Sequence, residues 1–318
     1  MTQITLGDLQ ESVRDRSAFT SLADYFLFSK AFLGLIERDH PTRIVSPTQP
    51  NYIFFQYGSD FGHKITRPLN ADLLIGSETD LMTEYERFMT FLSDLRRHQE
   101  MACEPIARQK YLASRPVNRM IYTFQQAIGC ICDTFDDTNQ SRKRAGQLFE
   151  SLVKLVIQEV GVECEPRTIN LPIPDYTGYE MSYELDLVFS RHHAILASET
   201  RVIHPSEVIG SVKTTSKDRI DKIFLDKYLL TKFLGRNVPV IAIFLHDVQR
   251  ARRGNSIFGI NSTFKTNHFL GYSVALNRLD GVYYVDPRPE MLVNPRLNEQ
   301  IFEFQQFLTR DLWSLTRG

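Results

Sequence analysis

Two acidic residues and one lysine have the types and order needed to act together in catalysis. The lysine closes the motif Ser211-Val212-Lys213, and the acids are Asp186 upstream and Asp226 downstream. Carboxylate oxygens are preferred ligands of Mg²⁺, and a cation beside the attacking water or the scissile phosphate helps to activate or position it. These residue types are those that Mg²⁺-dependent hydrolysis of a phosphodiester requires.

Two predicted strands carry part of this set. Residues 183–189 (YELDLVF) alternate between apolar and polar side chains, which predicts a strand with Asp186 on the face opposite to the apolar residues. Residues 207–214 predict a second strand, on which Ser211 and Lys213 share one face because side chains two apart point the same way. A solvated strand face is the common interpretation of such acids, and a metal site is the other.

The third member lies on a predicted helix, residues 218–234, which starts near Ser216, a residue type favoured as an N-cap. Projected at about 100° per residue, the apolar stripe of this helix includes Asp226. The apolar members of the stripe are Ile220, Ile223, Phe224, Leu230, Phe233 and Leu234. A carboxylate on a core-facing stripe is costly unless it is paired or binds a cation. Asp226 therefore either forms a salt bridge with Lys222 or Lys227 or ligates a metal.

At this point a family resemblance applies. Asp186, the pair Ser211-x-Lys213 and an acid thirteen positions after the lysine resemble the rearranged PD-(D/E)xK site of type II restriction endonucleases. The resemblance is closest to the group that cuts CCGG or CCNGG sequences, the EcoRII-type enzymes and their relatives. In that group the second acid is absent from the strand and comes from the next helix, an arrangement that Ser211 and Asp226 match. The helix acid is usually Glu in the group and is Asp in this chain.

Two further motifs extend the resemblance, which covers about residues 138–245. Lys217-Asp218-Arg219 matches a basic–acidic–basic triplet that begins four residues after the lysine in the group. The segment from Arg144 to Glu150 (RAGQLFE) matches an R-A-G-x-x-[FL]-E helix upstream. The resemblance implies that Glu150 lies near the metal site and that Gln140, just ahead of this helix, can reach an edge of the minor groove.

The resemblance also implies a function. It implies a type II restriction endonuclease of a restriction–modification system, a homodimer that cuts double-stranded DNA with Mg²⁺ held by Asp186 and Asp226. Lys213 would stabilise the charge that develops on the phosphorane or orient the attacking water. Two alternatives stay open, a repair or junction-resolving nuclease on the same core and a non-catalytic DNA-binding protein with a decayed site. The intact set of three catalytic residues speaks against the second alternative.

The basic–acidic–basic triplet predicts base recognition. At the tip of a strand that opens a helix it can enter the major groove, where Lys217 or Arg219 can donate to guanine N7 and O6 and Asp218 can accept from cytosine amino groups. One acid between two cations suits two adjacent G·C pairs. With two-fold symmetry, this predicts a palindromic site that contains CC and GG. Ordinary charges in the first turn of a helix are the other interpretation.

Composition and charge exclude several classes of protein. The chain of 318 residues is 42% hydrophobic and 24% charged, as in globular proteins, and too apolar for disorder. The longest apolar run, residues 238–245, is too short to span a bilayer, and no secretory signal is visible. The absence of these signals, together with the low count of four cysteines, favours a cytoplasmic protein. The family resemblance implies that the cell is bacterial or archaeal. A net charge of −1 is low for a protein permanently bound to nucleic acid but compatible with one that binds it in a confined cleft and releases it.

The order of predicted elements favours an α/β fold with a restriction-endonuclease-like core, a mixed sheet flanked by helices. After residue 141 the predicted elements are a helix at 142–160, strands at 183–189, 193–202 and 207–214, a helix at 218–234 and a strand at 238–245, with a loop at 255–266 and a closing helix at 299–315. Helices at 22–36 and 81–98 flank an irregular segment, 41–68. We therefore predict a mainly helical N-terminal region, residues 1–115, for dimerisation or DNA contact, and a catalytic domain, residues 116–318.

Overall fold

The computed structural model describes residues 4–98, 105–217 and 219–317, which form two compact units. Unit 1 comprises the described residues within Met1–Phe91, Pro105–Leu155 and Val248–Thr263, and unit 2 those within Leu92–Glu104, Val156–Asp247 and Phe264–Gly318. The predicted division between residues 115 and 116 falls inside unit 1. The roles predicted for residues 1–115, dimerisation and DNA contact, stay predictions. No helix in the described ranges is long and apolar enough to cross a membrane.

Unit 2 is built on a six-stranded mixed sheet in the order β11-β10-β7-β6-β5-β4. Its strands are β4 (Glu163–Pro172), β5 (Glu180–Ser190), β6 (Val208–Thr215), β7 (Val240–His246), β10 (Gly281–Asp286) and β11 (Ile301–Glu303). Strands β4, β5 and β6 pair in antiparallel fashion, whereas β6, β7, β10 and β11 are parallel. This central mixed sheet with flanking helices confirms the predicted fold class.

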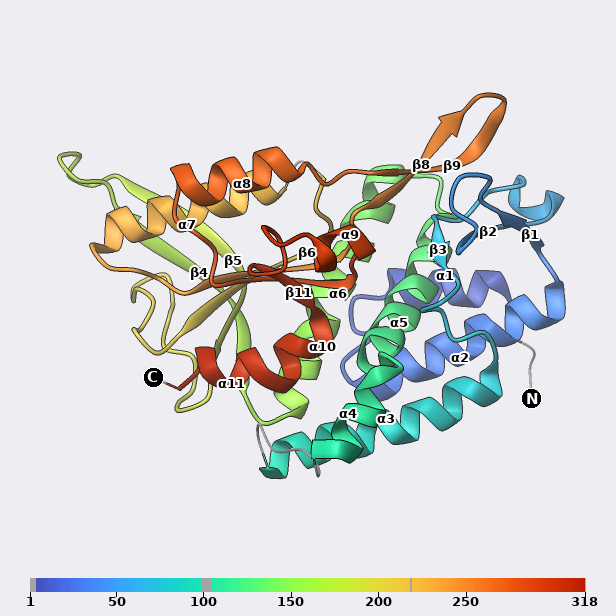
Figure 1. Cartoon of the computed structure of the whole chain (residues 1–318), viewed down its shortest axis with the longest axis horizontal. Helices are drawn as coiled ribbons and strands as arrows, with labels where there is room; N and C mark the ends of the chain where they lie inside the picture. The colour runs from blue at the N-terminus through green and yellow to red at the C-terminus, as the bar shows by residue number, and fades with distance from the viewer. Residues whose placement is uncertain (1–3, 99–104, 218, 318) are drawn as a thin grey trace. The chain divides into compact units, whose positions relative to one another are not determined.

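Helices cover both faces of this sheet (Figure 1). α7 (Ile220–Leu234) and α8 (Thr266–Ala275) lie side by side along one face. α10 (Phe304–Gln306), a π-helical turn (Phe307–Asp311) and α11 (Leu312–Leu315) lie along the other, and a short helix, α9 (Pro289–Val293), precedes β11. The predicted apolar stripe of α7 is confirmed, because Ile223, Phe224 and Leu230 are buried in the core with residues of β5, β6 and β7.

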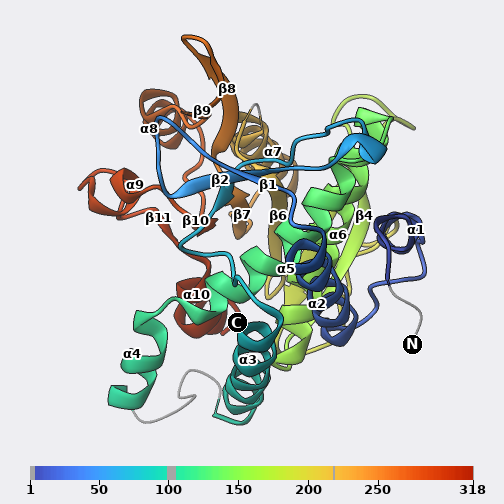
Figure 2. The same ribbon diagram turned by 90° about the vertical axis from the view of Figure 1, so that its right-hand side faces the viewer.

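Unit 1 is mainly helical. Its helices are α1 (Leu6–Arg14), α2 (Leu22–Asp39), α4 (Pro105–Ala113) and α5 (Pro116–Cys132), while α3 (Glu78–His98) and α6 (Thr138–Glu159) begin in unit 1 and end in unit 2. Capping boxes start α1 and α2, since Thr5 pairs reciprocally with Asp8 and Ser21 with Asp24. Figure 2 shows α2 and α5 side by side.

Two small sheets complete unit 1. β1 (Thr42–Val45), β2 (Tyr52–Gln56) and β3 (Leu69–Asn70) form one, with a 3₁₀ turn at Ser59–Phe61, and the hairpin of β8 (Val248–Arg253) and β9 (Ser256–Ser262) forms the other. Buried side chains of β2, β8 and β9 form a common apolar cluster of Tyr52, Phe54, Val248 and Ile260.

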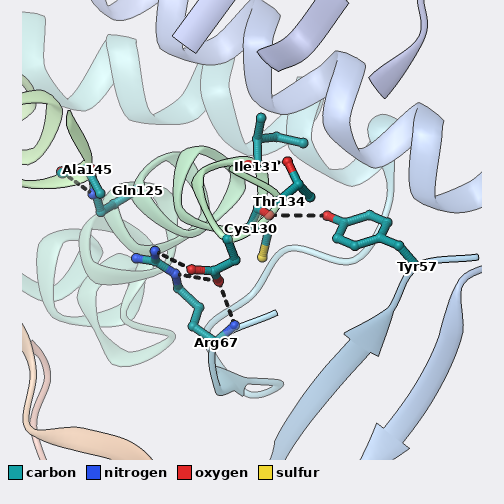
Figure 3. Close-up of polar contacts among 8 residues, drawn as sticks. Tyr57, Arg67, Gln125, Cys130, Ile131, Thr134 and Ala145 are labelled. Carbon is teal, nitrogen blue, oxygen red and sulfur yellow. Dashed lines mark hydrogen bonds and ion pairs between the residues drawn. The ribbon is translucent and has the colours of Figure 1, made fainter. Parts of the chain in front are cut away.

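The end of α5 is tied to the chain that follows β2 (Figure 3). The backbone N–H and the guanidinium of Arg67 donate to the carboxylate of Asp133 at 2.7–3.0 Å, and the Tyr57 hydroxyl donates to the Cys130 carbonyl at 3.4 Å. Gly129 allows this close approach, because a Cβ there would lie 2.5 Å from the guanidinium carbon of Arg67.

Several predicted elements are wrong. Residues 193–202 do not form a strand. The N–H groups of Leu196 and Ala197 donate instead to the fully buried carboxylate of Glu207, which also accepts from the N–H of His204 just beyond this segment. The expected irregular segment 41–68 contains β1 and β2, and the expected loop 255–266 contains β9. The closing helix predicted at 299–315 begins as strand β11, because residues 301–303 pair with β10.

Candidate active site

Asp186, Lys213 and Asp226 line one pocket of about 90 Å³ in unit 2. β5 supplies Asp186, β6 supplies Lys213 and α7 supplies Asp226. The antiparallel register places Leu187 opposite Gly210, so Asp186 lies beside Ser211 across the two strands. The structure therefore brings together the three residues that the sequence predicts to act together.

Asp186 is held in place by three donors from β6. Its Oδ2 accepts hydrogen bonds from the Ser211 hydroxyl at 3.1 Å and from the Val212 N–H at 2.9 Å, and it forms a salt bridge with the Lys213 ammonium. Both charged side chains are only partly exposed, 19% for Asp186 and 28% for Lys213. Because all three donors contact Oδ2, Oδ1 of Asp186 is the oxygen that could ligate a metal.

Asp226 is half-buried and, among the described residues, forms no salt bridge within 4.0 Å. Burial raises the pKa of its carboxyl group, and the nearby Asp186 carboxylate raises it further, against the opposing effect of Lys222 and Lys213. The alternative of a salt bridge with Lys227 is excluded, because that ammonium pairs with Asp280 at 2.6 Å. An unpaired carboxylate beside a second carboxylate is unfavourable until a cation neutralises the two.

The donor set of the pocket fits Mg²⁺. Within the described ranges, no three His, Cys, Asp or Glu side chains are grouped closely enough to hold a metal ion by themselves. Mg²⁺ commonly binds through one or two carboxylates and completes its octahedron with water and substrate phosphate oxygens. Asp186 and Asp226 could supply the two carboxylates, which would leave the remaining positions for water and a phosphate.

The same pocket is lined by Glu184, Arg219 and Lys222. The sequence indicates Lys222 as a neighbour of Asp226, because side chains four apart share a helix face, but it does not predict that Glu184 and Arg219 line this pocket. Arg219 is predicted as a base-reading residue, but it also lies where a cation could contact a phosphate bound in the pocket. The two roles of Arg219 differ in what they predict for binding to cognate and to random DNA.

The basic–acidic–basic triplet, Lys217-Asp218-Arg219, falls between β6 and α7 in the sequence. Lys217 is exposed, Arg219 is exposed at the N-cap position of α7, and Asp218 lies outside the described residues. Ser216 is not the helix cap, since α7 begins at Ile220 and Ser216 is buried at the end of β6.

Glu150 and Gln140 lie on α6, in unit 1. Gln140 is exposed in the first turn of this helix, and Glu150 lies three turns further along it. The predicted proximity of Glu150 to the metal and the predicted contact of Gln140 with the minor groove stay predictions.

No protein-family model and no curated protein sequence matches the chain. Among solved structures, it is similar to the crystal structure of the type IIP restriction endonuclease Kpn2I, with a TM-score of 0.67 and 17% identity over 97% of each chain. A weaker similarity, with a TM-score of 0.39 and 13% identity over 64% of this chain and 79% of the other, is to the restriction endonuclease PspGI in its complex with substrate DNA. The first similarity extends over nearly the whole of both chains, so the protein has the fold of a restriction endonuclease.

Proposed function

We propose that the chain is a type II restriction endonuclease, an enzyme that uses Mg²⁺ to hydrolyse double-stranded DNA at a specific palindromic sequence. The observation that supports this most directly is the pocket of unit 2, in which Asp186, Lys213 and Asp226 meet at the junction of two strands and a helix. The fold shared with Kpn2I agrees with this proposal.

In this reaction each charged residue of the pocket would have a distinct role. Asp186 and Asp226 would hold Mg²⁺, which when bound lowers the pKa of a ligated water and neutralises charge on a phosphate. Lys213, already within salt-bridge distance of Asp186, would donate to the phosphate oxygens as negative charge develops there, or orient the attacking water. The other strand of a palindrome presents an equivalent phosphate, so two copies of the chain would cut both strands.

The target would contain CC and GG, as CCGG or CCNGG. The chemistry of the triplet supports this proposal, because Lys217 and Arg219 can donate to guanines and Asp218 can accept from cytosines. A neighbouring gene for a cytosine methyltransferase would support the place of the enzyme in a restriction–modification system.

Incubation of phage DNA with the purified protein and Mg²⁺ tests the activity. Discrete bands are expected, whereas a smear would indicate a nuclease that recognises DNA structure, and intact DNA a non-catalytic DNA-binding protein. We expect Lys213→Ala to lower the cleavage rate by at least ~10²–10³-fold, the cost typical of removing one transition-state donor. Asp186→Ala should lose a comparable or larger factor.

Lys232→Ala is the matched control, because Lys232 is an exposed lysine of α7 that does not line the pocket. It should cut at the wild-type rate. Circular dichroism would establish that all variants are folded. Cleavage by folded Lys213→Ala at the wild-type rate would show that the active site is assigned to the wrong residues.

A further inference from the structure

Unit 1 contains a second pocket of about 80 Å³, here named the cationic pocket, and none of the described residues that line it is acidic. Four cations line it, and its other lining residues include an aromatic ring and an amide: Arg14, Arg16, Lys143, Arg144, Phe135 and Gln140. Its volume corresponds to roughly two or three water molecules at about 30 Å³ each, which is room for one small anion.

Local structure holds these cations together without any ligand. Arg144, in the second turn of α6, donates to the carbonyl oxygens of Val13 and Asp15, both at 2.6 Å, and so fixes the end of α1. The guanidinium carbon of Arg14 lies 4.5 Å from the centre of the Phe135 ring, a cation–π contact. Two sequence-distant segments, the end of α1 and the start of α6, therefore converge on one concave site.

The acids near the cationic pocket already have other partners. The Asp15 carboxylate accepts from the N–H and hydroxyl of Ser17, and Asp136 pairs with Lys64 at 2.7 Å. Asp137 caps α6 through the N–H groups of its first turn. None of these carboxylates lines the pocket.

The nearby acids neutralise the cations only in part, since Asp136 acts on Arg14 and Asp15 acts on Arg144 from beyond salt-bridge distance. Within the described residues, Arg14, Arg16 and Lys143 form no salt bridge within 4.0 Å. Burial lowers the pKa of the Arg144 guanidinium, and the charge of Arg16 lowers it further, against the opposing effects of Tyr25, Cys132 and Asp15. Like charges held together in a concavity repel one another, and an anion bound among them removes this repulsion.

We propose that the cationic pocket binds a phosphate group, and that this phosphate belongs to the DNA backbone. The second part rests on the proposed function. Planar guanidinium groups contact phosphate oxygens in bidentate geometry, and Lys143 adds a point charge. A phosphate held in the pocket would bring the DNA backbone beside Gln140, the residue for which the resemblance implies a minor-groove contact.

Binding to duplex DNA tests the proposal, measured by fluorescence anisotropy with Ca²⁺ in place of Mg²⁺ over a range of KCl concentrations. The variant R16A/K143A is compared with R43A/R142A, which removes the same charge from exposed positions of unit 1 outside the pocket. Loss of one phosphate contact should flatten the slope of log Kd against log salt by about 0.9 and weaken binding about tenfold near 0.1 M salt. The control pair should change Kd less than about twofold.

Equal effects of the two double variants on Kd and slope would overturn the proposal. If the wild-type protein binds no duplex DNA, the proposed function fails. A thermal shift assay with inorganic phosphate then tests whether the cationic pocket binds phosphate on its own. Phosphate that raises the Tm of wild type and R43A/R142A, but not of R16A/K143A, would support a site for free phosphate. The same shift in all three proteins would overturn the phosphate site as well. Cleavage by Lys213→Ala tests the proposed function separately, because Lys213 is not part of this pocket.

Discussion

The carboxylate of Asp226 binds either a proton or a cation more readily than an exposed carboxylate would. Burial raises its pKa above the ordinary value of 3.8, and Asp186 acts in the same direction. Between that value and the raised pKa, the folded state binds more protons than the unfolded state, so the free energy of unfolding falls as pH rises through this window. At neutral pH the ionised Asp226 is therefore a local cost to stability, which a bound Mg²⁺ would offset.

We therefore expect Asp226→Asn to raise the Tm of the metal-free protein at neutral pH. We also expect it to lower strongly the rate of DNA cleavage with Mg²⁺. Asp221→Asn is the control, because Asp221 is exposed in the first turn of α7, where a negative charge stabilises the helix. This control should leave the Tm unchanged or lower it. Calorimetry at neutral and acidic pH measures the difference, which should shrink as pH falls through the raised pKa and vanish below the ordinary value of 3.8. A lower Tm for Asp226→Asn at neutral pH would contradict the account of Asp226.

Arg219 has two possible partners, a guanine edge and a phosphate in the catalytic pocket. If it reads guanine, Arg219→Ala should weaken binding to the cognate site by about 1–3 kcal/mol and binding to random DNA far less. Gel shifts with cognate and random duplexes in Ca²⁺ measure this ratio. Equal losses on both duplexes would assign Arg219 to the phosphate, in agreement with its place in the pocket, and remove the physical basis of the CC/GG prediction.

At the scale of elements, α7 is anchored to the sheet by the residue next to Asp226. The Lys227 side chain is only 2% exposed, and its ammonium donates to the Arg278 carbonyl at 2.5 Å and to Asp280 Oδ2 at 2.6 Å. The same oxygen of Asp280 accepts from the Val240 N–H of β7 at 2.7 Å. The ion pair thus joins the helix that carries Asp226 to the centre of the sheet.

Asp280→Ala should lower the free energy of unfolding by about 3–5 kcal/mol, because it leaves the buried Lys227 ammonium without its counter-charge. Asp39→Ala, which removes the largely exposed Arg38–Asp39 pair, should cost less than about 1 kcal/mol. Guanidinium chloride unfolding of both variants provides the comparison. A cost for Asp280→Ala as small as that for Asp39→Ala would show that Lys227 can reach solvent or another partner.

At the scale of the whole molecule, we expect a symmetric dimer on palindromic DNA. A palindrome presents two equivalent phosphates, and under the proposed function one pocket would act on one strand at a time. Light scattering should give twice the mass of the chain for the free protein, and that mass plus the mass of one duplex for the complex with cognate DNA. A monomer under both conditions would contradict the prediction.

How much of the site is encoded locally can be judged from individual residues. The period of two on β5 and β6 and the stripe of α7 indicated Asp186, Lys213 and Asp226, because side-chain direction along a regular element depends only on position. The α/β fold class followed from the order of elements. The cap of α7 was predicted wrongly at Ser216, because a residue type favoured at helix starts does not reveal that the residue is buried and that the helix begins four residues later.

Other features depend on contacts that no local pattern specifies. Residues 193–202 have the composition of a strand, but the N–H groups of Leu196 and Ala197 donate to the buried carboxylate of Glu207. Lys227 is paired with Asp280 and not with Asp226, because the pairing of β10 with β7 holds Asp280, the residue before β10, beside Val240 within reach of Lys227. The sequence alone thus determined which residues could do chemistry and on which elements they lie. Only the tertiary structure decided which residues pair with them and which side chains line the two pockets. Ion pairs and pockets form where segments that are separate in the sequence come together, and no local pattern specifies which segments do so.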